Sequence, residues 1–191
     1  MKQTPKDTIL DIGCGTGGTV GCLSSEYRCI GLDTSETAIQ LAKRKYPGCE
    51  FRIGDIFDHC KVLSEDTALF TLMDVLEHLP DDHKALQQVI RCARPGSHIL
   101  ITVPANPALW SEHDVSAEHY RRYTADSLRD LWTGLPVRTK LFSYFNYRLY
   151  WPIRFALTFG RWFGVFSGED GGNLRLPPAP INTFLTDIFA G

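Results

Sequence analysis

The sequence has almost no excess of charge of either sign. Its 191 residues include 20 lysines and arginines and 22 aspartates and glutamates, which gives a formal net charge of -2 at pH 7. No overall field therefore attracts nucleic acid or an anionic membrane, and we predict no nucleic-acid partner. The chain also lacks internal repeats and low-complexity tracts. Its length predicts a single domain, residues 1–191.

The sequence also lacks a zinc-binding cysteine pattern and a secretory leader. No two of its six cysteines have the C-x-x-C spacing, so we predict no metal site and interpret the cysteines as buried thiols in a reducing compartment. The chain opens MKQTPKD and enters a β-rich run at once, without the apolar core of a signal peptide. We therefore expect a cytoplasmic protein.

What the sequence does contain is an alternation of β-rich and helical segments. The β-rich runs lie at 8–12, 28–33, 49–55, 67–74 and 97–104. Helical patterns follow several of them, at 35–48 and from Pro80 to the turn at 94–96, and Thr124 caps a short further helix. Strands separated by helices indicate βαβ units. The predicted fold class is α/β: a doubly wound, Rossmann-like, mostly parallel sheet with flanking helices.

A glycine-rich turn follows the first predicted strand. The stretch ILDIGCGTGG, residues 9–18, fits G-x-G-x-x-G, and Asp33 ends the next strand. Glycine lets a ligand approach the backbone, and a carboxylate at the second position accepts hydrogen bonds from ribose hydroxyls. The pattern favours a ligand that contains a nucleoside. The alternative, a strand-to-helix turn that binds nothing, remains open.

The aspartates near the strand ends distinguish between nucleoside ligands. Asp11, Asp33, Asp55 and Asp74 each lie at or near the carboxyl end of a predicted strand, where open parallel sheets bind ligands. Asp11 would repel the pyrophosphate of a dinucleotide, whereas a ligand with an ammonium and a sulfonium group favours acidic neighbours. The charges therefore fit S-adenosyl-L-methionine better than NAD. Asp55 and Asp74 could instead cap the turn or helix that follows each of them.

Five stretches, spread over residues 9–104, resemble class I S-adenosylmethionine-dependent methyltransferases: LDIGCGTGG, GLDTSETAIQLAKRK, FRIGDIFD, LMDVLEHLPD and RPGSHILITVP. The chain is similar to the broad small-molecule group that includes quinone-pathway O-methyltransferases. The resemblance implies that Asp33 holds the ribose, that Asp55 and the backbone of Ile56 meet the adenine, and that Asp74 lines the floor near the methionine. It places the remaining cofactor-binding positions beside the methionine part and the ribose: Asp11, Gly13, Cys14, Gly15 and Gly17. For Glu77 and His78, contact with the cofactor and simple capping are equally open.

The segment at 105–123 combines histidines, arginines and aromatic residues after the fifth predicted strand. Its length and its lack of a sustained period predict a loop that binds the acceptor. The candidate catalytic residues are His119 and His113, and the candidate substrate-binding residues are Tyr120, Arg121 and Arg122. His119 would act as a base or orient the acceptor, and a base is optional because the cofactor itself activates the methyl group. Alternatively, one arginine pairs with Asp114 or Glu118 and one histidine only orders the loop.

The segments after the loop carry three further expectations. The resembled fold has a sixth strand, which we expect here at about 137–145, and a seventh strand after it. The prolines within 174–191 predict that this seventh strand is missing from this chain. Eleven of the 26 residues at 141–166 are aromatic, and three arginines interrupt this segment, so we do not expect it to span a membrane. This segment is either a lid over the site or a peripheral membrane contact.

Residues 1–104 are therefore predicted to bind the cofactor and 105–191 to form the acceptor side. The function predicted from the sequence is S-adenosylmethionine-dependent methyl transfer to a small or lipid-like acceptor. Two alternatives remain open, an NAD-dependent oxidoreductase and a non-catalytic cofactor-binding regulatory domain. The sequence specifies neither the acceptor atom nor the oligomeric state.

Overall fold

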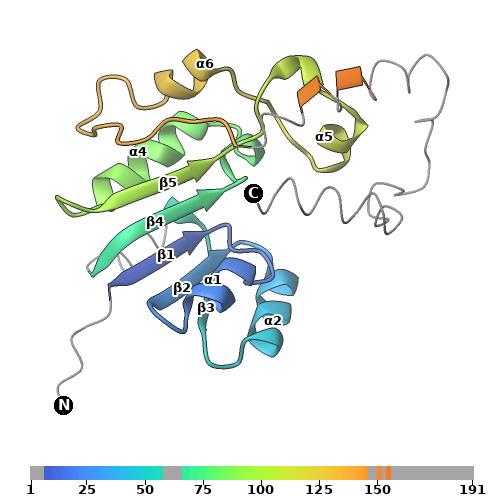
Figure 1. Ribbon diagram of the computed structural model, residues 1–191. Coiled ribbons are helices and arrows are strands. Elements are labelled where there is room, and N and C mark those ends of the chain that lie inside the picture. Colours follow the sequence, from blue (N-terminus) through green and yellow to red (C-terminus); the bar gives the residue numbers. More distant parts are fainter. Residues whose placement is uncertain (1–6, 58–65, 146–149, 152–153, 156–191) are drawn as a thin grey trace. The chain divides into compact units, whose positions relative to one another are not determined.

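The computed structural model describes residues 7–57, 66–145, 150–151 and 154–155 (Figure 1). These residues divide into two compact units. The first holds the described residues up to Pro107 together with Glu118–Val137, and the second holds Ala108–Ala117 and the described residues from Arg138 onward. The parallel sheet and the glycine-rich turn belong to the first unit. A single domain over 1–191 stays a prediction.

A parallel sheet of five strands forms the first unit. The strands are β1 (Thr8–Ile12), β2 (Arg28–Asp33), β3 (Glu50–Ile53), β4 (Thr67–Met73) and β5 (His98–Thr102). They are ordered β3-β2-β1-β4-β5, so the chain moves outward from β1 first on one side and then on the other. This order confirms the predicted α/β class. It also creates a switch point at the carboxyl ends of β1 and β4, where open sheets of this kind bind ligands.

The two faces of the sheet bury different apolar side chains. Ile9 packs in one core with Val20 of α1 (Gly18–Leu23) and Ile39 of α2 (Glu36–Lys45). The next residue along β1, Leu10, belongs to the other core, with Leu86 of α4 (Asp82–Cys92). That core also contains Leu131, which follows α6 (Ala125–Asp130). Figure 1 shows α1 and α2 beside β1–β3 and α4 beside β4 and β5. Because both faces are covered, the central strands β1 and β4 are mostly apolar, and Asp11 and Thr71, which are buried polar residues on them, are hydrogen-bonded to each other.

Side-chain caps set where the helices begin. Ser35 accepts a hydrogen bond from the backbone N–H of Ala38 at the start of α2, and Asp81 accepts one from Lys84 at the start of α4. Thr124 accepts a hydrogen bond from Ser127 N–H, which confirms the cap predicted for the short helix α6. Each cap satisfies a backbone donor that has no partner within its own helix.

The expected sixth strand at 137–145 is wrong. The segment is irregular, and nearly all of its residues are exposed. Within the described chain β5 pairs only with β4, so this segment has no ladder partner, and its large apolar side chains Val137, Leu141 and Phe145 are exposed. The seventh-strand prediction for 174–191 lies outside the described residues. So does most of 141–166, whose lid and membrane roles stay predictions; no helix in the described part of the chain has the length and apolarity needed to cross a membrane.

Two other expectations need correction. The segment at 105–123 is not irregular throughout, because it contains η2 (Pro107–Leu109) and α5 (Glu112–Ser116). Ser111 and Asp114 form a capping box that starts α5, a local signal that lies in the sequence. Among the described cysteines, Cys14 and Cys29 are buried, but Cys22 is exposed on α1.

We predict that Gly31→Ala lowers the free energy of unfolding by about 1–3 kcal/mol, the usual cost of overpacking a core. A Cβ atom at Gly31 would lie 2.6 Å from Cδ1 of Phe51 and 2.8 Å from Sγ of Cys14, inside the core beneath the glycine turn. Urea denaturation monitored by circular dichroism measures the change. Gly48→Ala is the matched control, because nothing lies within 4 Å of its Cβ position. Equal stability of the two variants would contradict the packing described for Gly31.

Candidate functional site

The glycine-rich turn is held against the ends of β1, β2 and β4. The backbone N–H groups of Gly13 and Cys14 both donate to the carbonyl of Leu32, at 2.8 and 3.1 Å. A Cβ atom at Gly13 would lie 2.5 Å from Cγ2 of Val75, and one at Gly17 would lie 2.6 Å from the Phe51 ring. Both positions therefore need glycine for close packing.

Gly15 differs from its neighbours because the space beside it is open. Its φ of +52° is in the left-handed region that favours glycine, and no atom lies within 4 Å of its Cβ position. This open face is where the turn can accept a ligand against its backbone. Of the three glycines with positive φ in this turn, Gly13 and Gly17 are closely packed and Gly15 faces open space.

Asp33 links this turn to the end of β2. Its two carboxylate oxygens accept hydrogen bonds from the backbone N–H groups of Gly15, at 2.7 Å, and Ser35, at 2.8 Å. The side chain is half-buried, and a carboxylate oxygen can accept more than one hydrogen bond. Asp33 therefore holds the turn in place and keeps acceptor capacity for hydroxyl groups of a ligand.

Asp11 and Cys14 lie beneath the turn. Burial raises the pKa of Asp11, and the nearby charge of Asp33 raises it further. The 2.6 Å hydrogen bond that the Thr71 hydroxyl donates to Asp11 partly opposes this increase. Burial, followed by the charges of Asp33 and Asp11, raises the pKa of Cys14 to about 12. Cys14 packs in the core of α1 and α2, so only its backbone can take the cofactor-binding role predicted for it.

Asp55 and Asp74 are exposed at the ends of β3 and β4. Asp55 accepts a hydrogen bond from the Phe57 N–H at 2.7 Å, the turn cap that the sequence left open as an alternative, and Ile56 beside it is buried. Asp74 accepts a 3.3 Å hydrogen bond from the Thr102 hydroxyl and has a φ of +54°. Their contacts with a cofactor stay predictions.

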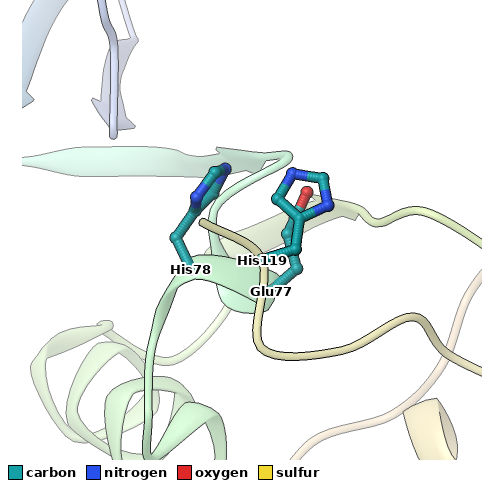
Figure 2. Close-up of side chains that lie close together, drawn as sticks. All are labelled: Glu77, His78 and His119. Carbon is teal, nitrogen blue, oxygen red and sulfur yellow. The ribbon is translucent and has the colours of Figure 1, made fainter. Parts of the chain in front are cut away.

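The turn after β4 brings three chemically active side chains together. Glu77 and His78 lie in the short helix η1 (Leu76–His78), and the backbone N–H of Tyr120 donates to the carbonyl of Glu77 at 2.8 Å. This hydrogen bond places His119 beside Glu77, and the rings of His78 and His119 lie 4.6 Å apart in an edge-to-face arrangement (Figure 2). Glu77 is fully buried, His119 is half-buried and His78 is exposed.

Arg121 is used within the fold. Its guanidinium forms a 2.7 Å ion pair with Asp82 and donates to the carbonyl of Pro80 at 2.8 Å. The buried Tyr123 hydroxyl donates to the same Asp82 oxygen at 2.7 Å. The sequence allowed one arginine of this segment to pair with Asp114 or Glu118. Arg121 pairs with Asp82, an acid that the sequence analysis did not name, and Asp114 caps α5.

The other predicted acceptor residues have varied surroundings. Arg122 is half-buried and donates to the carbonyl of Ala105 at 3.4 Å, and Tyr120 is 59% exposed. His113 is exposed on α5, in the second compact unit. His119, Tyr120, Arg121 and Arg122 belong to the first unit, as do the predicted cofactor-binding residues.

We predict that Asp82→Asn lowers the free energy of unfolding at pH 7 by about 1.5–3 kcal/mol, the usual range for hydrogen bonds to a charged group. Burial acts to raise the pKa of Asp82, but the hydrogen bonds from Tyr123 and Arg121 outweigh it, and the net pKa is lowered from the ordinary 3.8. Burial and the hydrogen bond to Asp82 together raise the pKa of Tyr123.

The sign of the pH dependence follows from this lowered pKa. The folded state binds the Asp82 proton more weakly than the unfolded chain, so the stabilisation is present above about pH 4 and is lost as the pH falls below it. Urea titrations at pH 7 and pH 3 should show the difference between wild type and Asp82→Asn shrinking at pH 3. Asp126→Asn, at an exposed pair with Arg129, is the control. A constant difference at both pH values would contradict the assignment.

Three comparisons with known proteins agree with this architecture. The family model described as "Methyltransferase domain" matches residues 2–135. The chain is 33% identical to norajmaline N-methyltransferase of Rauvolfia serpentina, over 52% of this chain and 36% of that protein. It is 25% identical to the ubiquinone biosynthesis O-methyltransferase of Serratia proteamaculans, over 64% of this chain and 54% of that protein.

A solved structure shares the same fold. The plantazolicin methyltransferase BamL, solved with a triazolic desmethylPZN analogue and SAH, matches with a TM-score of 0.58 at 19% identity, over 69% of this chain and 54% of that chain. The chain therefore spans about a third to a half of the relatives named here. The family match covers the sheet, the glycine-rich turn and the segment that carries His119, and this protein belongs to the methyltransferase domain family.

Proposed function

We propose that this protein transfers a methyl group from S-adenosyl-L-methionine to a small or lipid-like acceptor. The observation that carries the proposal is the contact between Asp33 and the Gly15 N–H, at the switch point of the sheet. A carboxylate fixed beside an open glycine backbone suits a ribose, whose hydroxyls donate to the carboxylate while the sugar lies against the turn.

The residues present fit this cofactor. Gly15 leaves space beside the turn, and Asp11, Asp33, Asp55 and Asp74 provide acidic surroundings for an ammonium and a sulfonium group. Asp33 would hold the ribose, Asp55 and the backbone of Ile56 the adenine, and Asp11, Asp74 and the turn the methionine part. When bound, S-adenosyl-L-methionine supplies an activated methyl group, so the protein's main task is to align the acceptor with it.

The acceptor side is proposed to include the segment that carries His119. This segment is hydrogen-bonded to η1, whose neighbour Val75 packs against Gly13, so His119 is connected to the glycine turn by a short chain of contacts. His119 would take the acceptor's proton or orient its reacting atom, with Tyr120 as packing and Arg122 opposite a negative group. Arg121 holds this segment in place through Asp82. The N- and O-methyltransferase names of two relatives support a small-molecule acceptor without selecting the reacting atom.

We predict that Asp33→Asn weakens the binding of S-adenosylhomocysteine by about tenfold or more. The substitution keeps the shape of the side chain but removes the charge that strengthens its hydrogen bonds, worth about 1.5–3 kcal/mol. Isothermal titration calorimetry measures the affinity, and thermal unfolding of the same sample reports whether the turn is still folded. Asp126→Asn, at an exposed position on α6, is the control.

The same titration separates the proposed cofactor from the alternatives. Tight binding of NADH and none of S-adenosylhomocysteine would favour an oxidoreductase. Unchanged affinity of the folded Asp33→Asn variant for S-adenosylhomocysteine would contradict the ribose contact. Binding of S-adenosylhomocysteine without methyl transfer to any acceptor in a labelled-cofactor screen would favour a non-catalytic domain.

We predict that His119→Ala lowers turnover by about 100-fold while leaving the affinity for S-adenosylhomocysteine nearly unchanged, in line with the usual contribution of a positioned acid–base group. Transfer of labelled methyl groups to an acceptor found in that screen measures turnover. The control is His83→Ala, because His83 is exposed on α4 and lies outside the His119 cluster. Full activity of His119→Ala would move the acceptor site away from this segment.

A further inference from the structure

Glu77, His78 and His119 offer the ligand atoms of a metal site. One carboxylate oxygen and one nitrogen from each ring all lie within 4.8 Å of one another. Figure 2 shows the two rings and the Glu77 carboxylate grouped at the turn that follows β4. Ligands about 2.1 Å from a tetrahedral ion lie about 3.4 Å apart, so small side-chain rotations suffice to close the set around an ion.

The chemistry of these three side chains favours a divalent transition-metal ion. Imidazole and carboxylate together suit zinc and its first-row neighbours, and a set of two histidines and one carboxylate is typical of metal sites that keep a position open. His78 is exposed, so an ion can enter from solvent.

Backbone structure presets the cluster. Glu77 and His78 are fixed by η1, and His119 is fixed because the next residue, Tyr120, donates to the Glu77 carbonyl. Arg121 anchors the same segment to Asp82 and Pro80. Three ligands from two distant parts of the sequence are thus held by contacts that do not involve the ligand atoms themselves. This is the support that a preorganised metal site requires.

We propose that Glu77, His78 and His119 bind one divalent transition-metal ion that orients an oxygen of the methyl acceptor. The site stands on its own geometry, whereas the role toward the acceptor rests on the function proposed above. Val75, two residues before Glu77, packs against Gly13, and two residues of chain span at most about 7 Å. The site therefore lies close to the glycine turn. This proposal differs from our expectation, drawn from the sequence, that the chain contains no metal site.

The ion would make a general base unnecessary. A divalent cation lowers the pKa of a hydroxyl whose oxygen it binds, so the proton leaves to solvent. The acceptor oxygen then forms a bond to the methyl carbon with its own electron pair. The bond between that carbon and the sulfonium sulfur breaks with its pair remaining on sulfur, which leaves a neutral thioether. With the ion bound, His119 would take the second of the two roles proposed above and orient the acceptor through the ion.

Titration with Co²⁺ tests the site directly. The protein is first dialysed against a chelator, and the visible absorption of Co²⁺ is then followed as the ion is added. We expect one ion per chain. We also expect His78→Ala and His119→Ala to weaken binding by at least about tenfold, since loss even of outer groups around a metal costs 10- to 100-fold. His78 is exposed, so its variant should remain folded. His83→Ala, which removes a histidine outside the cluster, should bind as wild type does.

Catechol serves as an oxygen-ligand probe for the open positions. Three protein ligands leave room for further ligands, so adding catechol to the Co²⁺-loaded protein should shift the absorption bands. No shift would overturn the role toward the acceptor. Co²⁺ binding that is absent, or that is equally strong in His78→Ala and His119→Ala, would overturn the site.

Titration with S-adenosylhomocysteine on the same samples keeps the two proposals apart. If the protein binds S-adenosylhomocysteine but does not bind Co²⁺, the metal site is overturned and the cofactor assignment is supported. Co²⁺ binding that depends on His78 and His119, without binding of S-adenosylhomocysteine, would support the site and overturn the cofactor assignment.

Discussion

The parallel pairing of β1 between β2 and β4 is the constraint on which the rest of the structure depends. This register sets Asp11 beside Gly31 on one strand and Thr71 on the other, and it ends all three strands at the same edge. The glycine turn can then bond to Leu32 at the end of β2 and pack against Val75 after β4. Shifting one strand by a single residue would reverse which side chains face each core.

The parts of this fold that depend on local sequence could be predicted from it. The strand–glycine–helix pattern and the position of Asp33 follow from short-range geometry, and the Thr124 cap depends on residues three positions apart. The alternation of strands and helices also predicted a parallel sheet, because a helix that crosses over between two strands leaves them parallel. The ligands of Asp55 and Asp74 could not be predicted in this way, because an aspartate that caps a turn and one that contacts a ligand look the same in the sequence.

Contacts between distant segments could not be predicted in the same way. Arg121 pairs with Asp82 rather than with the acidic residues nearest to it in sequence, because the backbone bond from Tyr120 to Glu77 brings it over the start of α4. That bond also brings His119 beside Glu77 and His78, and a cluster made from such distant positions has no ligand spacing that could be recognised in the sequence. The strand expected at 137–145 was implied by the resembled fold, and it does not form because the described chain offers this segment no strand to pair with.

The hydrogen bond between the Tyr120 amide and the Glu77 carbonyl has a thermodynamic consequence. It joins the segment that carries His119 to the turn that contains Val75, and Val75 packs on Gly13. A ligand at the glycine turn and a ligand beside His119 would therefore both contact parts of the chain that this hydrogen bond connects. Linkage is reciprocal: whatever factor one occupant applies to the affinity of the other, it receives in return. If the two ligands bind in a preferred order, that order reflects this coupling free energy. Weakening the hydrogen bond between Tyr120 and Glu77 would reduce the effect of each ligand on the affinity for the other.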